Sequence, residues 1–471
     1  MRGAPAIAVA ALFACKAFAG PPDFTAPSGV LEIHGRLLFG ANSAANGFEL
    51  WTSDGTAEGT RELEDIRAGS RGSYPSFITA LGTRAIFAAD DGVTGIELWS
   101  SDGEAADTKR LADIHRGSGS SMPTAITAAG SFAYFAADDG QHGFELWKTD
   151  GTARGTVLVA DIVRGSGGSM PRQLKAVGTR LFFVAADAEA GAELWTSDGT
   201  KAGTRRVADI NHGAADTHLD GFVALGERLC FVAADAEHGA EPWCTDGSTS
   251  GTRRIRDIYP DATGSRPRYL TVLDTAMGAT LFFQAADPAH GIELWKSDGT
   301  PAGTTLVKDI RAGRPNSLPS HLGVHARMLY FAATDGVHGV ELWRSDGTAD
   351  GTTLVADLSA GAASSSPAKF FTAGNQMLFV AGDGRHGWEL WKLPATTRSP
   401  TLVADLRPGP ESSWPEDFVA FRKGIVFTAD DARGEARLWK LDDAIGEAQG
   451  MSSGRMSGTA SASAAATIVA K

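Results

Sequence analysis

Acidic side chains recur at four positions of this sequence, and they are the first candidates for chemistry. A Glu precedes a recurring Trp, one Asp lies in the loop before that Glu, another lies in the turn after the Trp, and another closes the next apolar segment. Four positions with eight copies each account for 32 of the 56 acidic residues. Carboxylate oxygens are ligands that Ca²⁺ prefers, whereas Asp in a DG turn accepts backbone N–H bonds. No copy has the D-x-D-x-D-G spacing of established calcium loops, so the turn interpretation is favoured and Ca²⁺ stays an open alternative.

The loop Asp is the position we expect to contribute to ligand binding. Chain direction reverses at every predicted strand, so this loop shares one face with the link between repeats, and the "SDGTxxGT" turn lies on the opposite face. The expected ligand-binding face is formed by Asp91, Asp139, Asp187, Asp235, Asp287, Asp335 and Asp383.

Five histidines occupy one repeat position, five residues before the Trp: His142, His238, His290, His338 and His386. A set of equivalent histidines suggests a metal site. Zinc, however, needs ligands within about 2 Å, and equivalent positions in successive repeats lie on a wide circle. We therefore expect these side chains to pack in turns.

One link departs from the repeat and brings Asp216, His218 and Asp220 together in "NHGAADTHLDG", residues 211 to 221. Catalysis needs one asymmetric constellation, so this break is the weak candidate for acid, base or metal roles. Sequence drift in a solvent-exposed loop is the favoured explanation. No nucleophile elbow, P-loop or zincin motif is present.

Two cysteines, Cys230 and Cys244, remain after the first nineteen residues. They lie in two consecutive predicted strands and are centred on the intervening loop, so they face each other in the expected register. A cross-strand disulfide is the prediction for an exported protein, and two free thiols are the alternative. Two cysteines are too few for a disulfide-built scaffold.

These residues must be positioned by a repeating unit of short strands. The motif Trp recurs nine times, at intervals of 48 residues with a single interval of 52. Each unit holds four short segments bounded by Gly, Asp or Ser, as in "TAITAAG", "FAYFAAD", "FELWKTD" and "TVLVADI" between residues 124 and 162. A four-stranded sheet that must stack on its neighbours to bury its faces is a β-propeller blade.

The blade count follows from the copies. The first three strands appear nine times and the fourth eight times, which predicts an all-β propeller of about nine four-stranded blades with an incomplete last blade, over residues 30–442. Residues 20–29 form an N-terminal segment that can supply the closing strand. An eight-bladed ring with stray strands, or an open array, is the alternative. A Phe recurs in the second strand of each unit, and residues on both faces of that strand are apolar. This pattern predicts a strand that is packed on both faces.

The motif "ELWxxDGT" followed by "GTxLVxDI" resembles the ELWxxDGT repeat family of exported bacterial proteins, across about residues 30 to 442. The resemblance implies secretion and a propeller-like body, and it carries no established catalytic activity. The sequence departs from the motif at Pro242, which replaces Leu, at Pro394, which replaces the turn Asp, and at Arg437, which replaces Glu.

The N-terminus predicts export. Residues 1–19 combine an early Arg, an apolar run and a small-x-small site at Ala17-Phe18-Ala19, so they read as a signal peptide. Lipid attachment at Cys15 is the alternative. No later run has the roughly 18 apolar residues of a membrane helix. Residues 443–471 are small, polar and low in complexity, which predicts a disordered tail. The expected location is secreted or at the cell surface.

Charge and repetition together decide the functional expectation. The formal net charge of -13 disfavours binding to nucleic-acid phosphates. A repeated surface favours weak contacts multiplied by valency over one deep catalytic site. We therefore expect a monomeric binding or surface-interaction module for an extracellular glycan, matrix or protein partner, with no certain cofactor. The alternative is a propeller hydrolase or lyase acting on an extracellular polysaccharide.

Overall fold

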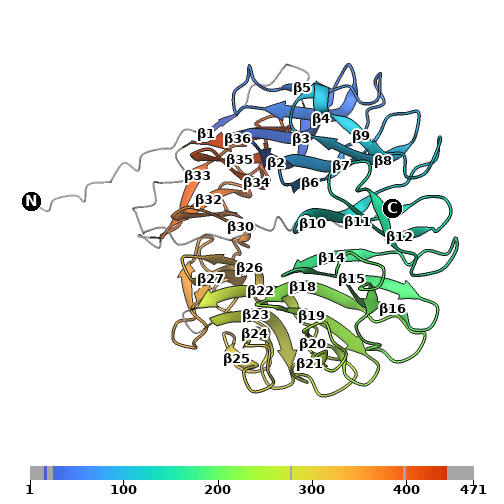
Figure 1. Cartoon of the computed structure of the whole chain (residues 1–471). Helices are drawn as coiled ribbons and strands as arrows, with labels where there is room; N and C mark the ends of the chain where they lie inside the picture. Colours follow the sequence, from blue (N-terminus) through green and yellow to red (C-terminus); the bar gives the residue numbers. More distant parts are fainter. Residues whose placement is uncertain (1–14, 18–24, 276–277, 396–398, 443–471) are drawn as a thin grey trace, which may run out of the picture.

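The repeats fold into nine four-stranded antiparallel sheets that follow one another around a closed ring (Figure 1). The computed structural model describes residues 15–17, 25–275, 278–395 and 399–442. The predicted all-β, nine-bladed propeller is confirmed. No helix in this part of the chain has the length and apolar character needed to cross a membrane.

Four strands build each blade, in chain order from the middle of the ring outward. The first strands are β2 (Thr25–Ile33), β6 (Ser76–Leu81), β10 (Thr124–Ala129), β14 (Arg172–Val177), β18 (Leu219–Leu225), β22 (Arg268–Thr275), β26 (Ser320–His325), β30 (Ala368–Ala373) and β34 (Glu416–Phe421). The second strands are β3 (Arg36–Ser43), β7 (Arg84–Asp90), β11 (Phe132–Asp138), β15 (Arg180–Asp187), β19 (Arg228–Asp235), β23 (Gly278–Asp287), β27 (Met328–Ala333), β31 (Gln376–Ala381) and β35 (Gly424–Asp430).

The outer half of each blade carries the motif Trp and the short edge strand. The third strands are β4 (Gly47–Ser53), β8 (Ile96–Ser101), β12 (Phe144–Thr149), β16 (Gly191–Ser197), β20 (Gly239–Thr245), β24 (Gly291–Ser297), β28 (Glu341–Ser345), β32 (Glu389–Pro394) and β36 (Ala436–Leu441). The fourth strands are β5 (Arg61–Glu64), β9 (Lys109–Ala112), β13 (Val157–Ala160), β17 (Arg205–Arg206), β21 (Arg253–Arg254), β25 (Thr305–Lys308), β29 (Thr353–Ala356) and β33 (Thr401–Ala404). A short 3-10 helix, η1 (Ala105–Asp107), lies in the turn before β9.

The last blade is completed by the N-terminal end of the chain. The C-terminal part supplies three strands, β34 to β36, and β1 (Cys15–Ala17) pairs antiparallel with β36. Residues 20–29 were expected to supply this closing strand, but their described part, from Thr25 onward, belongs to β2 of the first blade. The strand β1 lies inside the segment predicted as a signal peptide, and that prediction stays untested. The predicted tail lies outside the described residues.

Pairs of Phe and Trp form the core between blades. In every blade the Phe of the second strand pairs in register with the Trp of the third, as Phe87 does with Trp99. These two side chains and neighbouring Ala residues pack against the preceding blade, where they meet Leu50 and Leu63. Small Ala beside large Phe lets the sheets approach closely, and no blade covers its own faces.

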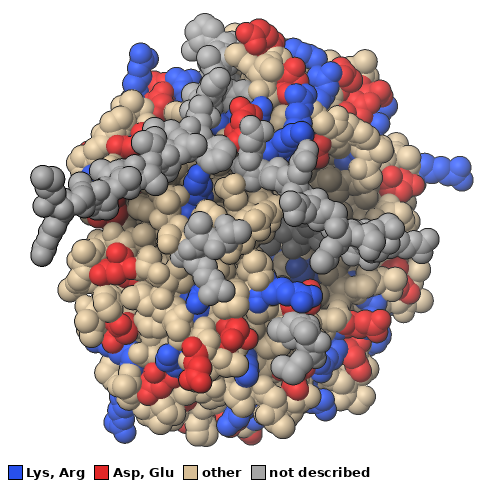
Figure 2. All heavy atoms as spheres, turned by 90° about the vertical axis from the view of Figure 1, so that its left-hand side faces the viewer, with Lys and Arg blue, Asp and Glu red and all other residues tan. Residues whose placement is uncertain are grey.

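The same contact closes the ring between the last blade and the first. Phe39 and Trp51 of the first blade pack against Phe421, Val426 and Leu438 of the ninth. First strands also contact one another in cyclic order, including β2 with β34. They surround the middle of the ring, and Figure 2 shows one face of the molecule that is hollowed near its middle.

Removing one interblade Phe tests this packing. Phe183 is fully buried, and Phe183→Ala should lower the free energy of unfolding by about 3 to 5 kcal/mol, because it removes apolar contacts and leaves a cavity. Trp414 is 51% exposed in a link, so Trp414→Ala should cost less than about 1 kcal/mol. Chemical denaturation measures both. Equal losses for the two variants would contradict the packing described here.

Candidate functional site

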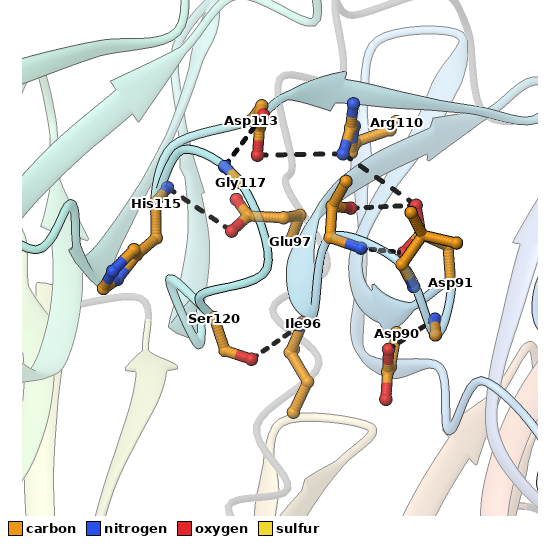
Figure 3. A network of polar contacts seen from close by, with 12 residues as sticks. Asp90, Asp91, Ile96, Glu97, Arg110, Asp113, His115, Gly117 and Ser120 are labelled. Carbon is orange, nitrogen blue, oxygen red and sulfur yellow. Dashed lines mark hydrogen bonds and ion pairs between the residues drawn. The ribbon is translucent and has the colours of Figure 1, made fainter.

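The Glu of the motif is fully buried in eight blades and connects each blade to the link that follows it. In the second blade Glu97 accepts hydrogen bonds from the backbone N–H of Ile114 at 2.9 Å and of Ser121 at 3.0 Å. The Ser121 hydroxyl donates to the same carboxyl at 2.6 Å. Figure 3 shows Glu97 beneath this link, with the His115 N–H also directed at it. The residue therefore satisfies backbone donors that burial would otherwise leave unpaired.

Burial changes the protonation of these carboxyls. Desolvation raises the pKa of Glu49 to about 7, although a hydrogen bond from Ser73 and backbone N–H bonds act in the opposite direction. Glu293 also reaches about 7, again because desolvation outweighs hydrogen bonds such as that from Ser317. The pKa of Glu97 is raised for the same reason.

The departure from the motif at Arg437 has a physical explanation. Arg437 lies in β36, after which no further blade follows, so no link needs to be fastened there. Its guanidinium instead pairs with Asp431 at 3.4 Å and with Glu435. The Glu is present only where a link crosses to another blade.

The turn Asp stabilises its own turn. Asp150 Oδ1 accepts the Thr152 N–H at 2.9 Å and the Thr152 hydroxyl at 2.7 Å. The Thr152 hydroxyl in turn accepts the Gly155 N–H at 3.0 Å. The hydrogen bonds from Thr152 lower the pKa of Asp150. The recurring "DGTxxGT" letters thus encode one closed set of hydrogen bonds.

The loop Asp residues proposed for ligand binding are engaged within their own loops. Asp139 accepts the backbone N–H groups of Gln141 and His142 at 2.9 Å, and His142 Nδ1 lies 2.8 Å from Asp139 Oδ2. Desolvation alone would raise the pKa of Asp139, but these hydrogen bonds outweigh it and the pKa is lowered. The hydrogen bond to Asp139 raises the pKa of His142.

The same loop arrangement recurs in other blades. An imidazole Nδ1 contacts the loop Asp in the five pairs His142–Asp139, His238–Asp235, His290–Asp287, His338–Asp335 and His386–Asp383. Asp91 accepts the Val93 and Thr94 N–H groups, and Asp187 pairs with Arg206 at 2.7 Å. These pairs stabilise separate loops and do not converge.

The Asp at the end of the fourth strand serves the link rather than a shared ligand site. Asp309 Oδ2 accepts the Gly313 N–H at 2.9 Å, and Asp357 Oδ2 accepts the Gly361 N–H at 3.0 Å. Over the described ranges, no three His, Cys, Asp or Glu side chains are grouped so as to hold a metal ion. In the second blade Arg110 pairs with both the loop Asp91 and the strand-end Asp113, so a cationic side chain lies between these carboxylates (Figure 3).

The candidate link residues Asp216, His218 and Asp220 are not brought together. Asp216 Oδ1 accepts the Ala192 N–H at 2.7 Å, as Ser120 Oγ accepts the Ile96 N–H at 3.0 Å in the second blade. Asp220 Oδ1 accepts its neighbour's N–H, and His218 is exposed. No hydrogen bond or ion pair joins these three side chains in the described part of the chain. In this link Asp216 therefore takes the role that Ser120 has in the second blade, which is to accept one backbone N–H.

Cys230 and Cys244 pair in register on β19 and β20 and form a disulfide, with their Cα atoms 4.1 Å apart. Both are buried between the fifth and sixth blades. The bond crosses one hairpin and lies far from any exposed group that could act on a ligand.

A different repeat position carries the chemical variation that catalysis requires. Each first strand contains a β-bulge, and its first bulged residue has a left-handed backbone with φ between +52° and +66°. Bulges re-aim side chains and often lie near functional sites. This bulge position is occupied in chain order by Gly29, Phe77, Ala125, Gln173, Gly221, Tyr269, His321, Lys369 and Asp417.

Four successive blades place ionisable side chains at the bulge position, and we call Tyr269, His321, Lys369 and Asp417 the arc. The Tyr269 and His321 rings lie with centroids 5.4 Å apart. Lys369 Nζ lies 2.7 Å from the Glu416 carboxylate of the next blade. The arc follows the inner strands β22, β26, β30 and β34, beside the middle of the ring.

The pKa values of His321 and Asp417 are both shifted in the direction that favours the neutral form. Desolvation by the surrounding strands lowers the pKa of His321, and the nearby Lys369 charge lowers it further. Desolvation raises the pKa of Asp417, and Glu416 adds to this effect. His321 and Asp417 are thus a base and an acid with shifted pKa values, on the inner strands β26 and β34 of two blades that are separated by one blade. Groups with such shifts are candidates for general acid–base catalysis.

Sequence reasoning missed the arc because it followed the columns that repeat. A signal was present in the column that varies most, four residues after the link Ser or Thr. That column reads Phe, Ala, Gln, Gly, Tyr, His, Lys and Asp from the second blade onward, and only its last four members are ionisable.

Removing one buried carboxyl tests its structural role. Glu97→Ala should lower the free energy of unfolding by at least about 3 kcal/mol, because several buried donors lose their acceptor. Arg437→Ala at the same repeat position should cost less than about 1 kcal/mol, since its ion-pair partners Asp431 and Glu435 are partly exposed to solvent. Urea denaturation compares the two. A small effect of Glu97→Ala would contradict this assignment.

Protonation should make stability fall as pH rises through neutrality. Glu49 and Glu293 have folded pKa values of about 7 against an ordinary 4.5, so the folded state binds more protons than the unfolded state between these values. The raised pKa values of His142, His290 and His338 act in the same direction near neutral pH. The lowered pKa values of turn and loop Asp residues stabilise the fold above pH 3.8 and are lost below it. Denaturation across pH should therefore show maximal stability near pH 4 to 5. A rise from pH 5 to 8 would overturn this assignment.

Comparison with known proteins supplies structures but no family. No protein-family model and no curated protein matches the chain. Solved structures with a similar fold include a dipeptidyl peptidase 4 from Porphyromonas gingivalis, with TM-score 0.48, 9% identity, and coverage of 87% of this chain and 65% of the other. A structure from a study of two prolyl endopeptidases has a TM-score of 0.45 and 10% identity, and the match covers 87% of this chain and 55% of the other. A puromycin hydrolase has a TM-score of 0.40 and 12% identity, with coverage of 86% of this chain and 58% of the other. The chain spans little more than half the length of the latter two.

The expected role as a binding or surface-interaction module for an extracellular glycan, matrix or protein partner is corrected here. The three structures given above are named as peptidases or hydrolases, not as modules of that kind. At 9 to 13% identity the likeness itself shows the fold alone. The resemblance to the ELWxxDGT repeat family stays a prediction.

Proposed function

We propose that this protein is a hydrolase that cleaves an acyl bond by general acid–base catalysis at the arc. The observation that carries the proposal is the row of Tyr269, His321, Lys369 and Asp417 at one repeat position of four successive blades. The other recurring columns described above hold structural residues, whereas this one supplies a base, a cation and an acid on the inner strands of three successive blades.

His321 acts as the base. Its lowered pKa keeps the imidazole neutral at pH values where an ordinary histidine is partly charged, so it can take a proton from a water molecule. The water oxygen then bonds to the substrate carbonyl carbon. The Tyr269 ring packs beside the imidazole and restricts its orientation.

Lys369 and Asp417 act on the two atoms where negative charge develops, which are the carbonyl oxygen and the leaving atom. The Lys369 ammonium stabilises negative charge on the carbonyl oxygen, and its ion pair with Glu416 positions it. Asp417, whose pKa is raised, donates its proton to the leaving atom as the acyl bond breaks. The His321 imidazolium then releases its proton to solvent water and the Asp417 carboxylate takes one up, which restores both groups.

Hydrolysis of an unfolded polypeptide and of a p-nitrophenyl acyl ester tests the proposal. His321→Gln and Asp417→Asn should each lower kcat by about 100-fold or more, as removal of a general base or acid does. His290→Gln, in a loop pair outside the arc, is the matched control and should keep the parent activity. Loss of activity in that control, or full activity in the arc variants, would contradict the proposal.

The pH profile provides a second readout. Because the pKa of His321 lies below its ordinary 6.5 and that of Asp417 above its ordinary 3.8, kcat/KM should follow a bell with its maximum on the acid side of pH 6.5. His321→Gln should remove the acid limb of that bell. A profile that rises steadily to alkaline pH would exclude this pair as base and acid.

A further inference from the structure

Exposed apolar side chains gather at a second repeat position, which we call the link position. It is the residue after the link Ser or Thr, three residues before the bulge position. Of ten large hydrophobic side chains that are exposed in the described chain, five occupy the link position and two the bulge position. Those at the link position are Tyr74, Met122, Met170, Leu318 and Trp414, with exposures from 44% to 64%.

Four of these side chains and one Ala belong to successive blades. We call Trp414, Ala26, Tyr74, Met122 and Met170 the apolar band; they precede β34, β2, β6, β10 and β14 in order around the ring. The link positions before β18, β22 and β30 hold His218, Arg266 and Ser366 instead. The arc occupies β22 to β34 and meets the apolar band at β34, and Leu318 before β26 is the one exposed apolar link residue that lies within the arc.

The backbone at the apolar band is strained. Tyr74, Met122, Met170 and Trp414 have φ of +51°, +47°, +51° and +49°, in the left-handed region that bulky residues rarely adopt. Gly would relieve this strain. The same left-handed backbone occurs at Arg266, Leu318 and Ser366, so it belongs to the repeat. What distinguishes the band is that this backbone carries large apolar side chains that stay exposed.

Aromatic neighbours hold the two ends of the band in place. Tyr74 stacks on Phe48 at 5.8 Å, and Trp414 lies against Trp388 at 5.1 Å between ring centroids. The two methionines between them are unbranched and flexible, and such side chains adapt to apolar groups of different shape. The band is therefore an open apolar surface with fixed ends and an adaptable centre.

We propose that the apolar band binds apolar side chains of an unfolded polypeptide and that this polypeptide is the substrate of the arc. The inference rests on the proposed function and names its substrate class. An extended chain presents side chains at regular intervals, which matches apolar contacts offered blade after blade. An alkyl chain of a lipid ester instead needs an enclosed pocket, whereas these side chains are about half exposed.

Two labelled peptides that differ only by Leu or Ser at alternate positions test the band. The triple variant Tyr74→Gly, Met122→Gly, Met170→Gly should raise KM for the Leu peptide at least tenfold and leave kcat unchanged, because it removes binding contacts but no group of the arc. Its melting temperature should stay the same or rise, since Gly tolerates the left-handed backbone. Val337→Ser, at an exposed apolar loop residue outside the band, is the control.

Binding measured by fluorescence anisotropy in the His321→Gln background separates this inference from the proposed function. Weaker binding of the Leu peptide by the triple variant, with no change for the Ser peptide, supports the band. Unchanged binding and KM in a variant that still hydrolyses would overturn the band and leave the arc intact. Preferential cleavage of an acyl lipid ester would also overturn it. If the parent protein hydrolysed nothing yet bound the Leu peptide through the band, the proposed function would fail instead.

Discussion

A four-stranded blade of this size cannot bury its own faces, and the structure depends on fastening each blade to the next. Two contacts achieve this. Phe and Trp of one blade pack on the aliphatic side chains of its neighbour. The buried Glu accepts the backbone donors of the link that crosses between the blades. Arg437 stands in its place in β36, after which the described chain crosses to no further blade, and this agrees with a carboxyl that serves the crossing rather than the sheet.

Most acidic residues of the chain belong to this fastening system. Asp150 closes a turn, Asp139 closes a loop with His142, and Asp309 holds a link Gly. Each holds part of its own repeat in place, so most of the negative charge belongs to residues that stabilise turns, loops and links. Repetition therefore accounts for the residues that looked most like a ligand-binding surface.

Function is instead expected where the repeat varies without losing its backbone. The bulge and link positions keep a left-handed backbone in nearly every blade, yet their side chains range from Gly to Trp and from Lys to Asp. A backbone conformation maintained by the fold leaves the side chain free to differ from blade to blade. That freedom gives the ring the arc, with His321 and Asp417, and the apolar band, with Met122 and Met170.

Periodicity alone predicted the blades, the Phe–Trp core and the opposition of Cys230 and Cys244, because strand alternation and turn chemistry are local properties that repeat along the chain. It did not predict that Asp216, His218 and Asp220 stay apart. Asp216 accepts one backbone N–H, while the side chains of His218 and Asp220 point elsewhere, and this depends on the conformation of the link.

Periodicity also missed the arc. Tyr269, His321, Lys369 and Asp417 are separated by 48 to 52 residues in the sequence and become neighbours only when the ring places their inner strands side by side. The closing partner of the last blade was likewise a tertiary outcome, because an unpaired strand edge can accept any segment that reaches it, and the ring brings β1 to β36.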